Sequence, residues 1–199
     1  MNKQDLLMVG VGGQGIILAS DILGEAALTA GYDVKKTDTL GMAQRGGSVV
    51  SHVRIANEVS SPLIKEGEVD ILVAFEKLEA ARWGYYLRPG GLAIVNNHAM
   101  PPLSVSLGTH QYPSDEEIDD ILKQRTDRIC FADGTRRAGE VGDIRTLNMF
   151  MLGCVSHFVP IDVDIWKHCL SQRLPSNILQ INISAFDQGR KETSSVNLG

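Results

Sequence analysis

A glycine-rich turn near the N-terminus constrains the fold more than any other feature of the sequence. The short apolar run at residues 6–9 stops at Gly10-Val11-Gly12-Gly13-Gln14-Gly15, and residues 16–29 then repeat apolar side chains with a helical period. Gly31 ends that pattern as a C-terminal helix breaker. A buried strand, a tight glycine turn and a helix in this order predict the first unit of an α/β sheet.

The spacing Gly-x-Gly-x-x-Gly in this context allows several uses. Glycines let the backbone turn tightly and approach a ligand, and a helix N-terminus offers free N–H groups to an anion. An NAD site would also need an acidic residue at the end of the second strand, and Asp38 is roughly there. A turn that needs glycine only for packing, another anion, and a partner backbone stay open. Gln14 could bond a ligand or an adjacent loop, or face solvent.

A second glycine loop follows about thirty residues later. This loop contains Gln44, Arg45, Gly46 and Gly47. The arginine supplies a fixed cation, and the paired glycines after it let the backbone come close to another group. Such a loop suits a carboxylate, a phosphate or a subunit contact. If the first two strands run parallel, both loops share one edge of the sheet, and Arg45 should lie near Gly12. The candidate ligand- or partner-binding residues are Gly10, Gly12, Gly13, Gln14, Gly15, Gln44, Arg45, Gly46 and Gly47.

The rest of the chain continues as an α/β protein. Residues 38–48 show no helical period, so the alternating strand predicted at 49–55 has no crossover helix before it, which indicates an antiparallel member in a Rossmann-like, mostly parallel sheet. Further strands are predicted at 33–37, 69–75, 92–95 and 129–132, and helices at 76–87, 114–124 and, in three pieces, from 143 onward. We expect one domain over residues 1–188 and a frayed tail at 189–199.

Composition excludes several classes of function. The net charge is −5 and basic residues are scattered, which disfavours a nucleic-acid surface. The first apolar run is too short for a signal or membrane segment. Cys130, Cys154 and Cys169 are odd in number and far apart, so we expect a reducing cytoplasm. Without any CxxC spacing, we expect no metal or iron–sulfur cluster held by this chain alone.

Taken in order, the motifs resemble the gamma-type domain of the 2-oxoacid:ferredoxin oxidoreductase family. The two glycine loops carry most of this resemblance, and the form of residues 41–48 is similar to that of the indolepyruvate branch. The similarity runs from Asp5 to about residue 155. Further segments that resemble the family are Ser61-Pro62-Leu63-Ile64, Glu76-x-x-Glu79-Ala80-x-Arg82, Tyr112-Pro113 and Asn148-x-x-Met151-Leu152-Gly153.

The resemblance implies a three-layer α/β/α domain that acts as one subunit in oxidative decarboxylation. The family converts a 2-oxoacid, coenzyme A and oxidised ferredoxin to an acyl-CoA, carbon dioxide and reduced ferredoxin. Thiamine diphosphate, Mg²⁺ and iron–sulfur clusters would belong to a larger partner subunit, because this chain lacks the cysteine spacing and a thiamine motif. We expect the isolated chain to be inactive, to contain no catalytic residue of its own, and to form a homodimer or larger species.

Two other interpretations remain open at this point. The chain could be a stand-alone NAD(P)-binding oxidoreductase, or an adaptor domain with no ligand of its own. The sequence does not determine which 2-oxoacid is used, the oligomeric state, or whether the glycine loops touch coenzyme A or only the partner.

Overall fold

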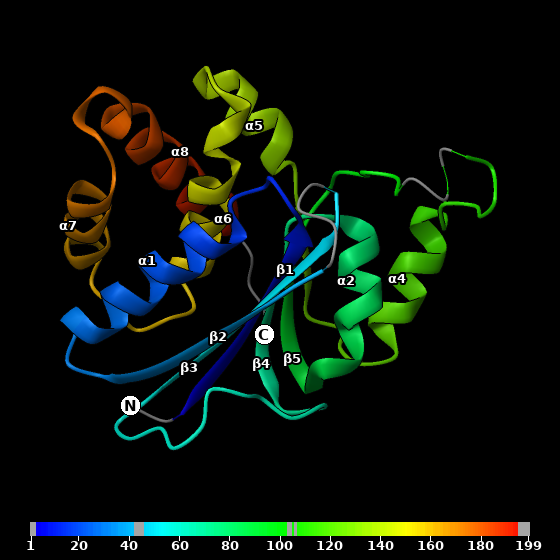
Figure 1. The fold of residues 1–199 in the computed structure, drawn as a ribbon, viewed down its shortest axis with the longest axis horizontal. Coiled ribbons are helices and arrows are strands. Elements are labelled where there is room, and N and C mark those ends of the chain that lie inside the picture. The colour runs from blue at the N-terminus through cyan, green and yellow to red at the C-terminus, as the bar shows by residue number, and fades with distance from the viewer. Residues whose placement is uncertain (1–2, 42–45, 103–104, 106, 195–199) are drawn as a thin grey trace.

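A mixed six-stranded sheet runs through the middle of the molecule (Figure 1). The structure is a computed structural model that describes residues 3–41, 46–102, 105 and 107–194. The sheet has the strand order β2-β3-β1-β4-β5-β6. The strands are β1 (Gln4–Val11), β2 (Asp33–Leu40), β3 (Ser48–Ala56), β4 (Val69–Ala74), β5 (Leu87–Asn96) and β6 (Ile129–Ala132). Because β1, β4, β5 and β6 are parallel neighbours, their carboxyl ends share one edge.

The predicted antiparallel member is β3, which pairs antiparallel with both β1 and β2. Its position between those two strands means that β2 runs in the same direction as β1. The carboxyl ends of β1 and β2 therefore lie at the same edge of the sheet. The loop that follows β2 and the glycine turn that follows β1 begin at this edge.

Helices cover both faces of the sheet, which confirms the expected three-layer α/β/α arrangement (Figure 1). Residues of β1 alternate between two cores, with Leu6 and Met8 in one and Leu7 and Val9 in the other. Burial on both faces explains why this strand is continuously apolar. One side carries α1 (Ile16–Thr29), α5 (Gly134–Val141), α6 (Leu147–Ser156), α7 (Val163–Arg173) and α8 (Ser176–Ser194), and the other carries α2 (Lys77–Trp83) and α4 (Asp115–Lys123).

The connections reverse direction between β1 and β4. Helix α1 leaves β1 on one face of the sheet, whereas α2 leaves β4 on the other face. Open α/β sheets place their ligand crevice at such a reversal, outside the carboxyl ends of the strands. The Gly10–Gly15 turn therefore stands where this fold class places a binding site.

Two helices differ from the sequence prediction. The helix predicted at 76–87 ends at Trp83, a short 3-10 turn spans Gly84–Tyr86, and β5 already begins at Leu87. Helix α5 was not predicted, because its sequence contains two glycines and few apolar residues.

The prediction of a frayed tail from residue 189 is wrong for residues 189–194, because α8 continues to Ser194. Gly189 and Thr193 are buried against α6, and the Thr193 hydroxyl donates a hydrogen bond to the Cys154 carbonyl at 3.2 Å. Because this segment is polar in composition, the sequence alone does not indicate its contact with α6.

Candidate functional site

The Gly10–Gly15 turn needs glycine for two separate reasons. A Cβ on Gly10 would lie 2.7 Å from Gln14 Oε1 and 2.8 Å from Phe75 Cβ, so close packing excludes any side chain there. Gly13 has φ 108° and Gly15 has φ 77°, which are left-handed conformations that favour glycine. Gly13 has open space around it, whereas a Cβ on Gly15 would lie 2.5 Å from Asn148 Nδ2. In this turn Gly13 is the exposed glycine with open space around it.

Gln14 bonds to the adjacent strands. Its Oε1 accepts the Val11 N–H at 2.8 Å, and its Nε2 donates to the Phe75 carbonyl at 2.9 Å. Asn96, at the end of β5, donates to the same carbonyl at 2.9 Å. The two side-chain amides therefore tie together the carboxyl ends of β1, β4 and β5. Of the roles left open for Gln14, the structure selects the bond to an adjacent loop.

The two glycine loops contact each other through their backbones. The Gly12 N–H donates to the Gly47 carbonyl at 2.8 Å, and the Gly46 N–H donates to the Gly12 carbonyl at 3.5 Å. The base of the second loop is closed by Gly41 N–H, which donates to the Ser48 carbonyl at 2.9 Å. The predicted shared edge is thus confirmed for Gly46 and Gly47. Gln44 and Arg45 lie outside the described residues.

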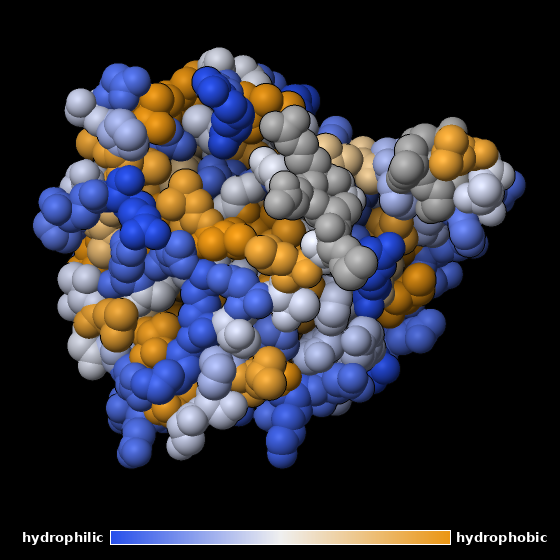
Figure 2. All heavy atoms as spheres, viewed as in Figure 1, coloured by the Kyte–Doolittle hydropathy of each residue, from blue (hydrophilic) through white to orange (hydrophobic). Residues whose placement is uncertain are grey.

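A hollow of about 620 Å³ opens between these loops and α1. Its walls are mainly aliphatic, and Figure 2 shows apolar surface gathered near the middle of this face. Helix α1 begins at Ile16, and its N-cap residue Gly15 has no side chain, so the first N–H groups of the helix have no side-chain acceptor at the cap. The site can therefore receive an apolar group together with a hydrogen-bond acceptor. The lining residues are Gly12, Gly13, Gly15, Ile16, Ile17, Leu40, Gly41 and Val49.

A buried carboxylate anchors the second loop where it enters β3. The Ser48 hydroxyl donates to Glu79 Oε2 at 2.5 Å, and the Trp83 indole N–H donates to the same oxygen at 3.2 Å. Arg82 neutralises the other oxygen at 2.6 Å. Glu79 is only 3% exposed, and its environment shows why a carboxylate is tolerated there. Ser48 and Glu79 were outside the residues proposed from the sequence, although the Glu76-to-Arg82 motif contained Glu79.

Glu76 fixes the start of α2 and a more distant segment. One of its oxygens caps the helix by accepting the Glu79 N–H at 2.9 Å, and the other accepts the Tyr112 hydroxyl at 2.5 Å and the Met100 N–H at 2.9 Å. Burial and the bond to Glu76 raise the pKa of the Tyr112 hydroxyl, which therefore remains a donor. The motif around Glu76 thus connects the start of α2 to the segments that contain Met100 and Tyr112.

Asp38 does not complete a dinucleotide site. It lies within β2, and its carboxylate accepts the Ser51 hydroxyl at 2.5 Å and the Lys36 ammonium at 2.9 Å. Strand β2 is also separated from β1 by β3, whereas a dinucleotide fold places the acid on the neighbouring strand. With Gln14 and Asn96 bonded across the strand ends, the geometry disfavours NAD(P) binding.

The three cysteines are buried and form no disulfide. Burial raises the pKa of the Cys130 and Cys154 thiols. Among the described residues, no group of three or more His, Cys, Asp or Glu side chains is placed to hold a metal ion. Within the same part of the chain, no helix has the length and apolar character to cross a membrane.

Comparison with known proteins identifies the family. Residues 5–192 match the family model for pyruvate ferredoxin/flavodoxin oxidoreductase. The indolepyruvate oxidoreductase subunit IorB of Pyrococcus horikoshii is 37% identical over 194 residues, which covers 96% of each chain. The 2-oxoglutarate synthase subunit KorC of Methanothermobacter thermautotrophicus is 30% identical over 193 residues, 95% of this chain and 94% of the relative.

The fold is also found in a solved structure. The gamma subunit of a keto/oxoacid ferredoxin oxidoreductase from Geobacter sulfurreducens superposes with a TM-score of 0.71 at 22% identity, over 96% of this chain and 98% of that chain. The resemblance based on the two glycine loops is confirmed by these matches. Since the family model and the curated relatives each cover nearly the whole chain, the protein belongs to the pyruvate ferredoxin/flavodoxin oxidoreductase family.

Proposed function

We propose that the chain is the small, beta-type subunit of an indolepyruvate:ferredoxin oxidoreductase, or of an enzyme for a closely related aryl 2-oxoacid. The observation that carries the proposal is the 37% identity, over 96% of both chains, to an indolepyruvate oxidoreductase subunit. The 2-oxoglutarate relative is less similar, at 30% identity, which favours the aryl substrate.

The complete enzyme would break the bond between the carboxylate and the carbonyl carbon of the 2-oxoacid. Carbon dioxide leaves, the thiol of coenzyme A loses its proton to solvent as its sulfur bonds to the acyl carbon, and two electrons pass to ferredoxin. Thiamine diphosphate with Mg²⁺ and iron–sulfur clusters supply this chemistry when bound. The residues described above do not fit those groups, so we assign them to a larger partner subunit.

This chain would contribute a rigid surface at the carboxyl edge of its sheet. Gln14, Asn96 and Glu79 hold the strand ends and the second loop in place, and Gly12 bonds to Gly46 and Gly47. We propose that the partner subunit, or the coenzyme A that it admits, lies against this surface. Arg45 would add a cation there for a phosphate or a carboxylate.

Purification from the native host tests the assignment. A tagged copy of the full chain should retain a larger subunit, and iron, sulfide and thiamine should be present in that complex. The same chain produced alone should contain no stoichiometric iron and should not change NADH or NADPH fluorescence. Recovery of the chain without a larger subunit, or a stoichiometric cofactor in the isolated chain, would contradict the proposal.

A further inference from the structure

A second cavity lies at the opposite edge of the sheet, near the amino ends of β1 and β4. Its volume is about 530 Å³, within the range of roughly 300–1,000 Å³ that is usual for small-molecule sites. The walls combine charged side chains from separate segments, Lys3, Asp70, Arg88 and Arg128, with the aliphatic side chains of Ile71 and Leu92. The glycine loops do not contribute to it, so it is independent of the proposed function.

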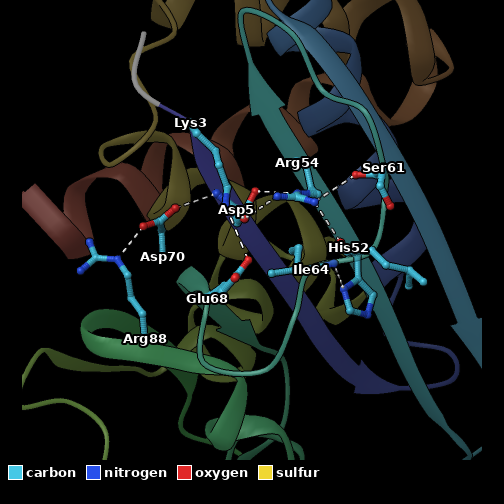
Figure 3. Close-up of polar contacts among 10 residues, drawn as sticks. Lys3, Asp5, His52, Arg54, Ser61, Ile64, Glu68, Asp70 and Arg88 are labelled. Atoms are coloured by element: carbon cyan, nitrogen blue, oxygen red, sulfur yellow. Dashed lines mark hydrogen bonds and ion pairs between the residues drawn. The ribbon is translucent and has the colours of Figure 1, made fainter.

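Positive charge dominates the lining of this cavity. Three of its side chains are cations and one, Asp70, is a carboxylate. Asp70 accepts Arg88 Nε at 2.6 Å and, through its other oxygen, the Asp5 N–H at 2.8 Å, so both of its oxygens are engaged (Figure 3). The lining therefore has cationic charge in excess of its own carboxylate.

Lys3 and Arg88 are able to accept an additional anion. Lys3 Nζ lies 2.8 Å from Asp5 Oδ2 and 3.8 Å from Glu68 Oε2, and the buried Asp5 carboxylate is also bonded by Arg54 Nε at 3.0 Å (Figure 3). The Lys3 and Arg88 side chains remain 48% and 46% exposed. Because both cations are about half exposed, they can contact a ligand while they keep these ion pairs.

The remaining wall favours a ligand with an apolar, flat body. Tyr32 and Phe158 add aromatic side chains to the aliphatic pair. Gln4 also lines the cavity, and its Nε2 donates to the Phe158 carbonyl at 2.7 Å. The aromatic and aliphatic side chains of this wall suit a flat, apolar ligand.

We propose that this cavity binds a small organic anion in which a carboxylate or phosphate is attached to a flat, apolar body. Lys3, Arg88 and Arg128 hold the anionic group, and the aromatic and aliphatic wall covers the body. Indole carboxylates and purine nucleotides are two sources of this shared chemistry. Cations grouped beside an apolar wall distinguish this cavity from an ordinary charged surface.

Calorimetric titration of the full chain with indole-3-acetate, ADP and inorganic phosphate tests the proposal. One of the two organic anions should bind roughly tenfold or more tightly than phosphate, because phosphate gains nothing from the apolar wall. Tighter binding of indole-3-acetate identifies an aryl carboxylate as the source, and tighter binding of ADP identifies a nucleotide. Absence of binding, or phosphate binding as tightly as both organic anions, would overturn the proposal.

Three single substitutions locate the site. Lys3→Gln and Arg88→Gln should each raise the dissociation constant of the organic anion roughly tenfold, because each variant removes a charge-assisted hydrogen bond. Arg145→Gln is the matched control, because Arg145 is 85% exposed, pairs with Asp143 and lies outside the cavity. Melting curves identify any variant that fails to fold, and Lys3→Gln, at an exposed side chain, is the variant expected to fold normally. Equal weakening by the control would mean nonspecific charge attraction and would reject the site.

Discussion

Gln14 occupies the point between β1 and β4 where open α/β sheets commonly hold a ligand. Both ends of its amide bond to the protein, one to Val11 N–H and the other to the Phe75 carbonyl. A turn with the spacing of a nucleotide fingerprint is thereby used to join strand ends. In this turn Gly13 is exposed, whereas the Gly12 N–H and carbonyl bond to the second glycine loop.

Removal of the Gln14 amide should destabilise the fold. Gln14→Leu leaves the Val11 N–H and part of the Phe75 carbonyl without a partner, and each unsatisfied buried group costs about 1–3 kcal/mol. Urea denaturation should show a loss of free energy of unfolding in this range. Gln172→Leu, at an exposed position of α7, is the control and should change stability by less than about 0.5 kcal/mol. Equal stability of the two variants would contradict the bracing role of Gln14.

His52 makes the stability of the chain depend on pH. Burial lowers the pKa of His52, and the nearby positive charge of Arg54 lowers it further. The unfolded histidine, with a pKa of about 6.5, then binds a proton before the folded one does. Its contribution is fully present above about pH 6.5 and is lost as the pH falls toward the folded pKa.

Replacement of His52 should remove this dependence. His52→Asn keeps an acceptor near the Ile64 N–H, which His52 Nδ1 now accepts at 3.3 Å, but it does not titrate. Between about pH 7.5 and 5.5 the free energy of unfolding should fall more for the natural chain than for this variant. Chemical denaturation at both pH values measures the difference, and parallel pH profiles would show that His52 does not titrate as described.

Helices α6 and α8 cross at two glycines, which permits their backbones to approach closely. A Cβ on Gly153 would lie 2.1 Å from the Phe186 carbonyl oxygen, and a Cβ on Gly189 would lie 1.9 Å from the Phe150 carbonyl oxygen. Because both obstacles are backbone atoms, the helices must separate to admit a methyl group.

Gly153→Ala and Gly189→Ala should each destabilise the chain by about 1–3 kcal/mol or more, as overpacking does. Gly139→Ala in α5 is the matched control, since no atom lies within 4 Å of the place that its new methyl group would take. Replacement of glycine by alanine inside a helix stabilises the fold by roughly 0.5–1 kcal/mol. The control variant should therefore melt at the same or a higher temperature. Thermal denaturation of all three variants makes the comparison, and a stable Gly189→Ala protein would refute the close crossing.

Sequence periodicity predicted these elements unequally. The buried strands and α1 follow from apolar runs and the Gly10–Gly15 turn, and the antiparallel β3 follows from the missing crossover helix. The end of α8 could not be predicted, because Gly189 and Thr193 become core residues only through contact with α6. At the site, glycine spacing located the two loops, but the bonds of Gln14 and Glu79 depend on residues 61 and 31 positions away.

On the scale of the whole molecule, the carboxyl edge is the surface we assign to the partner subunit. Leu40 ends β2 there with 61% of its surface exposed and lines the hollow beside α1. The homodimer expected from the sequence stays a prediction, and we expect such self-pairing to cover this apolar surface.

Leu40→Ser should weaken binding to the larger subunit. Burial of a leucine side chain contributes roughly 1.5–3 kcal/mol, so its loss should raise the dissociation constant about tenfold or more. Leu28→Ser, which is 55% exposed near the other end of α1, should leave affinity unchanged. Surface plasmon resonance with the immobilised larger subunit gives both values. Equal affinities of the two variants for the larger subunit would show that the hollow is not part of the interface.

We propose that this chain carries no redox cofactor of its own. Its larger partner needs this chain for activity. The most direct test measures indolepyruvate- and coenzyme A-dependent reduction of ferredoxin while the full chain is titrated into the purified larger subunit. Activity should be absent from either protein alone and should rise to a plateau at a fixed stoichiometry. Full activity of the larger subunit without this chain would contradict the account.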